Sequence, residues 1–366
     1  MKGLTVILVG CLLTAMAMRN ADLPSSSGHV PEIELRELFT VGSEAGEDGV
    51  FFGNIGNLVA VDDAGRIFIG EKQSPKIQAF TANGDLINEI GREGEAPGEF
   101  RSLGAIHAGP GDTLYTFDPT LRRISAFAPN TLDLANAFTV SGNATGSYPS
   151  DFFGAIDRGF LVVFEEPGSD SPRSLDANIV GWAGDVIQGP LMRLPAVEWV
   201  ILKGPYRPMA THMPFGRYSF FRLGPADHIY AGSSSSIEVT IVAADGTSRG
   251  SITHPLDGTP VTRSDIEEYV KDYSADIARQ VQRAMRYKTR PVYSTFIVDD
   301  RGRIWVRRSS ADKDAGTSRW LVLDAESQEV GELILPSSIS IQVVVDGRAY
   351  ATADGFRLVV YEISES

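Results

Sequence analysis

Histidine is the first residue type to consider, because three imidazole groups that converge can hold a zinc ion. The sequence has five histidines: His29, His107, His212, His228 and His254. Only His107 lies in a segment that we expect to form an inner strand of the fold, so a three-histidine zinc site is not expected. The single cysteine, Cys11, excludes both an intrachain disulfide and a zinc site built from cysteines.

A group of basic side chains is the main candidate for ligand binding. Arg207, His212 and Arg217 fall within one proline-rich segment, and Arg290 lies further along the chain. The chain has a formal net charge of -14, so these cations stand out against an acidic background and suit an anionic ligand. We predict that they bind a small molecule or a protein partner, whose identity the sequence does not reveal.

The sequence lacks the motifs of several enzyme classes. It contains no Gly-x-Ser-x-Gly elbow, no P-loop and no Gly-x-Gly-x-x-Gly that opens a βαβ unit. Acidic residues outnumber basic residues by 47 to 33, and no long Lys/Arg block is present, which argues against nucleic acid as a partner. We therefore assign no catalytic residue and favour a binding protein over an enzyme.

A repeated hairpin must position these side chains. An apolar run, a turn containing Asp and Gly, and a second apolar run occur at residues 58–69 and again at 296–306. In such a turn aspartate caps the backbone and glycine supplies a positive φ. Four weaker copies follow the same plan. The predicted turns lie near residues 65, 111, 158, 226, 302 and 347.

The repeat predicts the fold. Each hairpin is followed by a third apolar run and often a fourth, in units of about 45 residues, which is typical of a β-propeller blade. The last unit has only three strands before Ser366, whereas residues 32–41 supply an additional strand at the front. We predict an all-β fold over residues 31–366: a six-bladed β-propeller of four-stranded antiparallel blades, closed by the N-terminal strand.

A family resemblance rests on residues 91–100, Gly-Arg-Glu-Gly-Glu-Ala-Pro-Gly-Glu-Phe, preceded by Ile-Gln-Ala-Phe at 77–80 and Gly-Asp-Leu at 84–86. This stretch resembles the consensus of NHL-type repeats and, more broadly, six-bladed TolB-like propellers. The resemblance is good over residues 52–120 and fair over 292–336.

The resemblance implies an enzymatic alternative. Amidating lyases of the NHL type hold a metal with histidines around the central channel, a pattern that this sequence does not reproduce. Lactonase-type propellers hold a hard divalent ion such as Ca²⁺ or Mg²⁺ with carboxylate and asparagine ligands. Asn54, Glu71 and Asp151 are weak candidates for such a site. A metal-dependent lactonase or lyase, with its active site at the central channel, is therefore the alternative function.

Two blade-to-blade connections are overlong. The turn-to-turn intervals are 68 residues (158 to 226) and 76 residues (226 to 302), against 45 to 47 elsewhere. Both insertions should lie side by side on one face of the ring. We expect the first, residues 193–217, to be a loop, because its prolines oppose helix and ladder alike. We expect the second, residues 260–291, to be an amphipathic helix, which either lies on the ring or covers the channel as a lid.

The N-terminus is typical of an export signal. Lys2 precedes an apolar run too short to span a bilayer, and Ala15-Met16-Ala17 offers a cleavage site. We predict a signal peptide over residues 1–17, a flexible leader over 18–30, and a periplasmic or secreted protein without a transmembrane span. The alternative is a lipoprotein anchored at Cys11, because Leu8-Val9-Gly10-Cys11 resembles a lipobox.

Overall fold

The computed structural model describes residues 31–43, 50–142, 146–168, 173–204, 207–309 and 316–365. Over these residues the chain forms six four-stranded sheets and one separate two-stranded sheet. The predicted signal peptide, the leader and Cys11 lie outside the described residues. Among the described residues, no helix has the length and apolar character needed to cross a membrane.

The strands of the first three blades follow one another along the chain. The first blade is β2 (Val59–Val61), β3 (Ile67–Glu71), β4 (Lys76–Phe80) and β5 (Leu86–Ile90); the second is β6 (Ala105–Ala108), β7 (Leu114–Asp118), β8 (Arg123–Phe127) and β9 (Leu134–Thr139); the third is β10 (Tyr148–Ile156), β11 (Gly159–Glu165), β12 (Ser174–Gly181) and β13 (Val186–Pro195).

The last three blades follow the same plan with one exception. The fourth is β16 (Ser219–Leu223), β17 (Ile229–Ser233), β18 (Ile237–Val242) and β19 (Ser248–His254); the fifth is β20 (Tyr293–Val298), β21 (Ile304–Arg308), β22 (Thr317–Leu323) and β23 (Glu329–Pro336); the sixth is β24 (Ile339–Val345), β25 (Arg348–Ala353), β26 (Arg357–Glu365) and β1 (Ile33–Val41). In the sixth blade β1 comes from the other end of the chain.

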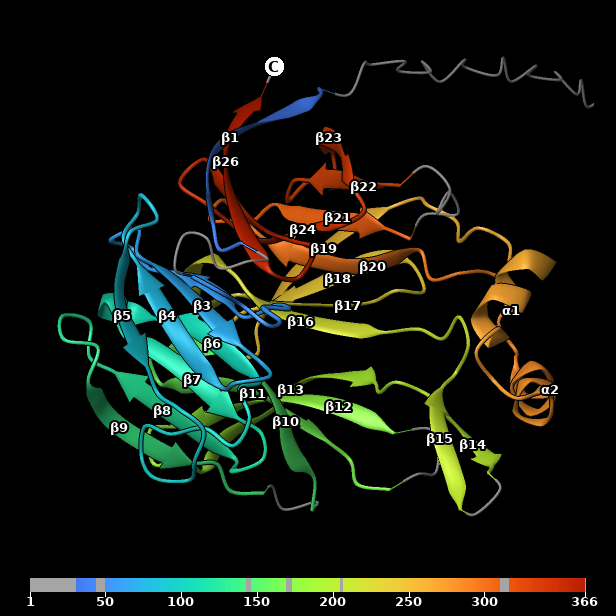
Figure 1. The fold of residues 1–366 in the computed structure, drawn as a ribbon, viewed down its shortest axis with the longest axis horizontal. Coiled ribbons are helices and arrows are strands. Elements are labelled where there is room, and N and C mark those ends of the chain that lie inside the picture. The colour runs from blue at the N-terminus through green and yellow to red at the C-terminus, as the bar shows by residue number, and fades with distance from the viewer. Residues whose placement is uncertain are drawn as a thin grey trace, which may run out of the picture.

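The six blades close into a ring. The innermost strands contact one another in the order β2, β6, β10, β16, β20 and β24, and β24 contacts β2 again. The N-terminal strand β1 pairs antiparallel with β26, from Ile33 opposite Glu365 to Val41 opposite Leu358. Figure 1 shows β1 and β26 side by side in this blade. The prediction of a six-bladed propeller closed by its N-terminal strand is confirmed.

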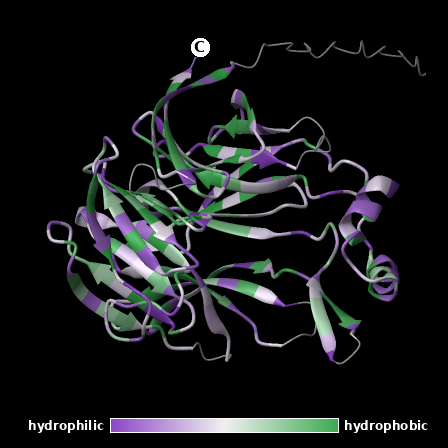
Figure 2. Ribbon diagram, in the orientation of Figure 1, coloured by the Kyte–Doolittle hydropathy of each residue, from purple (hydrophilic) through white to green (hydrophobic). Residues whose placement is uncertain are grey.

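The core consists of layers between neighbouring blades. Each of six clusters of buried apolar side chains combines residues of two adjacent blades. In one of them Trp305 of β21 and Trp320 of β22, both fully buried, pack with Ala351 of β25. Figure 2 shows the apolar residues along the blade strands. Every blade therefore relies on both of its neighbours to cover its apolar faces.

A repeated ion pair fixes the clearest hairpin turns. Asp62 accepts hydrogen bonds from the backbone N–H and Nε of Arg66, at 2.8 and 2.7 Å. Asp299 does the same with Arg303 at 2.8 and 2.7 Å, and also accepts one from Nε1 of Trp305 at 3.0 Å. Both aspartate side chains are fully buried. The aspartate that opens each turn therefore also holds its arginine and the second strand in place.

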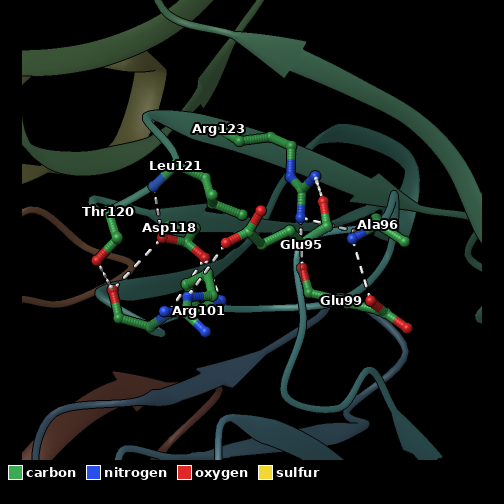
Figure 3. Close-up of polar contacts among 9 residues, drawn as sticks. Glu95, Ala96, Glu99, Arg101, Asp118, Thr120, Leu121 and Arg123 are labelled. Atoms are coloured by element: carbon green, nitrogen blue, oxygen red, sulfur yellow. Dashed lines mark hydrogen bonds and ion pairs between the residues drawn. The ribbon is translucent and has the colours of Figure 1, made fainter.

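The segment that carries the family resemblance connects the first blade to the second. Arg123 donates hydrogen bonds to the carbonyl oxygens of Glu95 and Ala96, at 2.7 and 3.0 Å. Asp118 accepts one from the backbone N–H of Arg101 at 2.7 Å (Figure 3). Phe100 is buried between the two blades. The residues that carry the resemblance thus help to join the first blade to the second.

The first insertion differs from the expected loop. It forms an antiparallel hairpin of β14 (Trp199–Lys203) and β15 (Pro208–His212). Its prolines do not interrupt the ladder, because Pro208 stands at the first position of β15, where it faces Lys203. The alternating exposure along β14 leaves Val200 and Leu202 buried and the other three residues exposed.

The second insertion is helical but is divided in two. Thr262 caps α1 (Arg263–Val270) in a capping box with Asp265. Ser274 then caps a second helix, α2 (Ala275–Ala284). The continuous helix that we expected is interrupted because Ser274 offers a new N-terminal cap. Both helices combine hydrophilic residues with apolar ones.

The two insertions lie side by side, as the topology predicts (Figure 1). Val200 and Leu202 of the hairpin pack with Val281 of α2 in a separate apolar cluster. Lys203 donates its backbone N–H to Oε1 of Gln280 at 2.8 Å, and Nε2 of Gln280 donates to the carbonyl oxygen of Lys203 at 3.2 Å. The helices therefore pack against the face of the hairpin that carries Val200 and Leu202.

Candidate functional site

A central cavity of about 550 Å³ lies where the innermost strands of all six blades meet. Its wall consists of apolar residues of the inner strands and of a few polar side chains. Those polar side chains are Asn57, His107, Asp151, Arg222, Thr295, Ser340, Gln342 and Thr352. A cavity of this volume and mixed lining is typical of small-molecule sites. We refer to it as the channel cavity.

A second cavity of about 260 Å³ lies beneath the β14–β15 hairpin. Its lining includes Trp199 and His212, which face each other in the hairpin, and apolar residues of the third and fourth blades. We refer to it as the hairpin cavity. Asp151 and Phe153 of β10 border both cavities. The two cavities therefore adjoin at these residues, and together they form what we call the binding compartment.

Asp151 has an unusual environment for a carboxylate. Its side chain is exposed within the two cavities that it borders, where the neighbouring protein limits its contact with bulk water. Burial raises the pKa of Asp151 to about 6, against the opposing effects of a hydrogen bond from the Phe152 amide and the charges of Arg222 and Lys72. A carboxyl group with such a pKa can accept or release a proton near neutral pH.

Arg222 brings a positive charge to the same wall. Its Nη1 donates to the carbonyl oxygen of Phe221 at 2.7 Å, and its Nη2 donates to Oγ1 of Thr295 on the neighbouring blade at 3.1 Å. The guanidinium carbon lies 5.8 Å from the ring centroid of Phe220 and 5.6 Å from that of Phe296. Burial lowers the pKa of Arg222, while the charge of Asp151 raises it. Neutral groups thus hold this cation in position.

His107 is the neutral member of the wall. Its Nε2 donates to the carbonyl oxygen of Phe152 at 3.0 Å, and the two rings meet edge to face at 5.2 Å. Burial lowers the pKa of His107 to about 4; the bond to Phe152 opposes this effect and the charge of Arg222 adds to it. At neutral pH the imidazole is therefore uncharged, with Nδ1 as its remaining acceptor.

The part of the hairpin cavity that the hairpin lines is aromatic. The rings of Trp199 and His212 lie 4.2 Å apart in an edge-to-face arrangement, and Tyr218 follows at 6.2 Å from His212. The carbonyl oxygen of His212 accepts a hydrogen bond from the hydroxyl of Tyr269 in α1 at 3.2 Å. Among the described residues, the linings of both cavities include none from α1 or α2. The hairpin, rather than a helical lid, thus borders the compartment.

The structure separates the four basic residues predicted to bind a ligand. His212 lines the hairpin cavity, and Arg207 is exposed at the turn of the hairpin. Arg217 donates from Nη1 to the carbonyl oxygen of Thr289 at 3.1 Å and stacks on a tyrosine ring. Arg290 forms an ion pair with Asp265. Arg217 and Arg290 therefore serve the attachment of the second insertion, while binding by any of the four stays a prediction.

The three weak metal candidates lie in different settings. Asn54 is exposed, whereas Glu71 is buried and accepts a hydrogen bond from the backbone N–H of Gly53 at 3.0 Å. Asp151 lines the binding compartment. Within the described ranges, no group of three or more histidine, cysteine, aspartate or glutamate side chains could hold a metal ion together. A bound Ca²⁺ or Mg²⁺ stays a prediction that metal analysis of the purified protein tests.

Arg222 was not among the predicted site residues, although the sequence contains a signal for it. The strand Ser-Phe-Phe-Arg-Leu carries one charge within an apolar run, at the innermost position of a blade. Asp151 in Ser-Asp-Phe-Phe presents the same signal on β10. Both charged residues line the channel cavity.

Comparisons with known proteins show the fold. No family model and no curated protein matches the sequence. A protein of Bacteroides fragilis, provisionally named an exported protein, has a similar structure, with 11% identity, a TM-score of 0.52 and coverage of 92% of this chain and 96% of its own. A member of the duf4221 family from Bacteroides vulgatus has 10% identity, a TM-score of 0.55 and coverage of 92% and 99%. At these identities the similarity concerns the β-propeller architecture alone.

Proposed function

We propose that the protein is an exported binding module that holds a small ligand in the binding compartment. The observation that carries this proposal is the position of Asp151, a carboxylate on an inner strand of the ring that lines two adjoining cavities. Apolar walls supply contact area, and the few polar groups supply orientation, which is the usual division of labour in a ligand site.

The arrangement of the insertions supports the same proposal. The hairpin contributes the aromatic pair Trp199 and His212 to the compartment, and α2 packs against its other face. A propeller needs no such addition for its stability, because the blades already bury one another. The additional segments therefore fit a role in closing one side of a ligand site.

The experiment is a thermal-shift screen of a small-molecule library against the purified protein. Val197→Trp should fill the hairpin cavity and Val343→Trp should fill the channel cavity, since each residue lines the respective space. Ile334→Trp is the matched control, because Ile334 is 56% exposed and borders neither cavity. Compounds that stabilise the wild type and the control but not the two filled variants support the proposal. Stabilisation that is equal in all four proteins would exclude the compartment as the site.

Export and family relationship are also part of the proposal. The apolar N-terminal run and the Ala-x-Ala site support delivery to the periplasm or the medium, with cleavage after Ala17 or lipidation of Cys11. The sequence of residues 91–100 supports a relationship to NHL-type and TolB-like propellers. Mass spectrometry of the mature N-terminus distinguishes a free chain from a lipid-anchored one.

A further inference from the structure

Arg222 is a partly buried cation without a carboxylate partner. Within the described residues, no acidic oxygen lies within the 4.0 Å of an ion pair from its guanidinium group. Its two hydrogen-bond acceptors, the carbonyl of Phe221 and the hydroxyl of Thr295, are both uncharged. Because a guanidinium group has five N–H donors, it retains the capacity to bind an anion in the channel cavity.

Asp151 is a carboxylate that has no cationic partner among the described residues. Its Oδ1 accepts one hydrogen bond, from the backbone N–H of Phe152 at 2.9 Å. Among the described residues, no hydrogen bond or ion pair reaches Oδ2. Asp151 lines both cavities, and its Oδ2 can accept a hydrogen bond from a cationic ligand group there.

The two charges lie in the same cavity wall but do not neutralise each other. Each one affects the pKa of the other through its charge, so they are electrostatically close. They nevertheless lie beyond the distance of an ion pair, on β10 and β16 of neighbouring blades. A ligand that carries both a positive and a negative group can satisfy both residues at once.

The hairpin cavity provides an apolar space next to this pair of charges. Its wall includes Phe153, Val163, Leu175, Val197 and Phe221, with Trp199 at the hairpin. Glu165, a second carboxylate in this wall, is already paired with Arg173. An apolar or aromatic group attached next to the positive group of the ligand would fit here, since removal of that surface from water favours binding.

We propose that the binding compartment takes a zwitterionic ligand with an apolar side chain, of the amino acid or short peptide class. Its carboxylate binds Arg222 in the channel cavity, its ammonium group binds Asp151, and its side chain enters the hairpin cavity. This inference rests on the proposed function, because it names the ligand class of the same site. Free amino acids and short peptides share this chemistry and differ only in the length of chain that the channel cavity must hold.

The test uses calorimetric titration of the wild-type protein with matched probes. The probes are phenylalanine, leucine, Leu-Leu and Leu-Leu-Leu, together with the amide and the N-acetyl derivative of each one. Loss of one charged hydrogen bond in a buried site should weaken binding by about tenfold or more. We therefore expect both derivatives of the preferred probe to bind at least about tenfold more weakly than the parent compound.

Variants assign each end of the ligand. In Arg222→Gln the parent compound and its amide should bind equally, and in Asp151→Asn the parent and its N-acetyl derivative should bind equally. Arg307→Gln is the control for Arg222, because Arg307 is also partly buried and donates to the carbonyl of Ser337 outside the compartment. Asp245→Asn is the control for Asp151, since Asp245 also accepts a backbone hydrogen bond, from Thr247.

The outcomes separate the two levels of the proposal. If no zwitterionic probe binds the wild type at millimolar concentration, or if the amide and N-acetyl derivatives bind as well as the parent, the assignment of the ligand class is wrong. A neutral or singly charged compound that needs the open compartment in the thermal-shift screen would leave the proposed function in place and still overturn this inference. The derivatives test the idea on the wild type, so the result does not depend on the folding of a variant.

Discussion

His107 should make the protein less stable in acid, and the size of the effect follows from its position in the channel. Burial lowers the pKa of His107 to about 4 from an ordinary value of 6.5. Because the folded-state pKa is lowered, the stabilisation is fully present above pH 6.5 and is lost as the pH falls toward 4. At pH 5 the imidazole is protonated in the unfolded chain but mostly neutral in the folded ring, which costs about 2 kcal/mol of unfolding free energy.

The assay compares wild type and His107→Asn by urea unfolding at pH 8 and pH 5. Asparagine is uncharged at both pH values and does not titrate. The variant loses the ring contact with Phe152 at both pH values, so only the difference between the two pH values is informative. Wild type should lose about 2 kcal/mol more than the variant between pH 8 and pH 5.

The control is His228→Asn, because His228 follows the turn between β16 and β17 and borders neither cavity. It tests whether replacement of a histidine outside the two cavities changes the difference between the two pH values. Equal losses in wild type and in His107→Asn would refute the reasoning, since they would mean that His107 takes up no extra proton on unfolding. A nuclear magnetic resonance titration of the His107 ring gives the folded-state pKa independently.

Three further predictions follow from the described contacts. Asp151→Asn should stabilise the ligand-free protein by about 1 kcal/mol above pH 7 and have little effect below pH 4, because the folded protein disfavours the ionised carboxylate, whose pKa is raised to about 6. The expected gain is kept small because solvent reaches this side chain. Urea unfolding at both pH values checks this, and an effect independent of pH would contradict it. Asp299→Ala should lower the unfolding free energy by about 3 kcal/mol, because it removes the acceptor of the buried indole N–H of Trp305 and of Nε of Arg303, whose ion pair with Glu365 remains. Asp324→Ala, in an exposed turn, should cost less than about 1 kcal/mol; equal costs would show that the buried contacts are unimportant. Val281→Asp should detach α2 from Val200 and Leu202 while the ring stays folded, so limited proteolysis should cut within residues 260–291, and resistance equal to that of wild type would argue against the packing described here.

The ring was predictable because its signals are local and repeated. The turns at Gly65 and Gly302 have the expected positive φ, of 77° and 78°. The position of β1 followed from counting strands, since a blade of three strands at one end needs a fourth from the other. The adjacency of the two insertions followed from topology alone. None of these inferences required knowledge of how distant side chains pack.

The details of the insertions were harder to predict. Proline density suggested a loop, but the prolines flank the β14 strand and stand at the start of β15, where the missing N–H does not disrupt the ladder. Ser274 was read as part of one apolar-striped helix, whereas it caps a second helix. In both places the structural effect of the residue depends on where it stands in its element: Pro208 begins a strand, and Ser274 precedes a helix.

The candidate site depends on the proximity of two inner strands, which the sequence alone does not reveal. Asp151 and Arg222 are 71 positions apart in the sequence. They share one cavity wall because two inner strands of neighbouring blades meet there. The basic residues singled out in the sequence were noticed for their contrast with the acidic chain. Two of them, Arg217 and Arg290, have partners within the protein. Charge contrast was therefore a weaker guide than the position of a charge on an inner strand.

A crystal structure of the protein with the ligand retained from the thermal-shift screen tests the central claim most directly. We predict electron density in the binding compartment, in contact with Asp151 and Phe153, where the channel cavity and the hairpin cavity adjoin. Density on the outer surface of the ring, or at Arg207 on the hairpin turn, with solvent alone beside Asp151, would contradict the account.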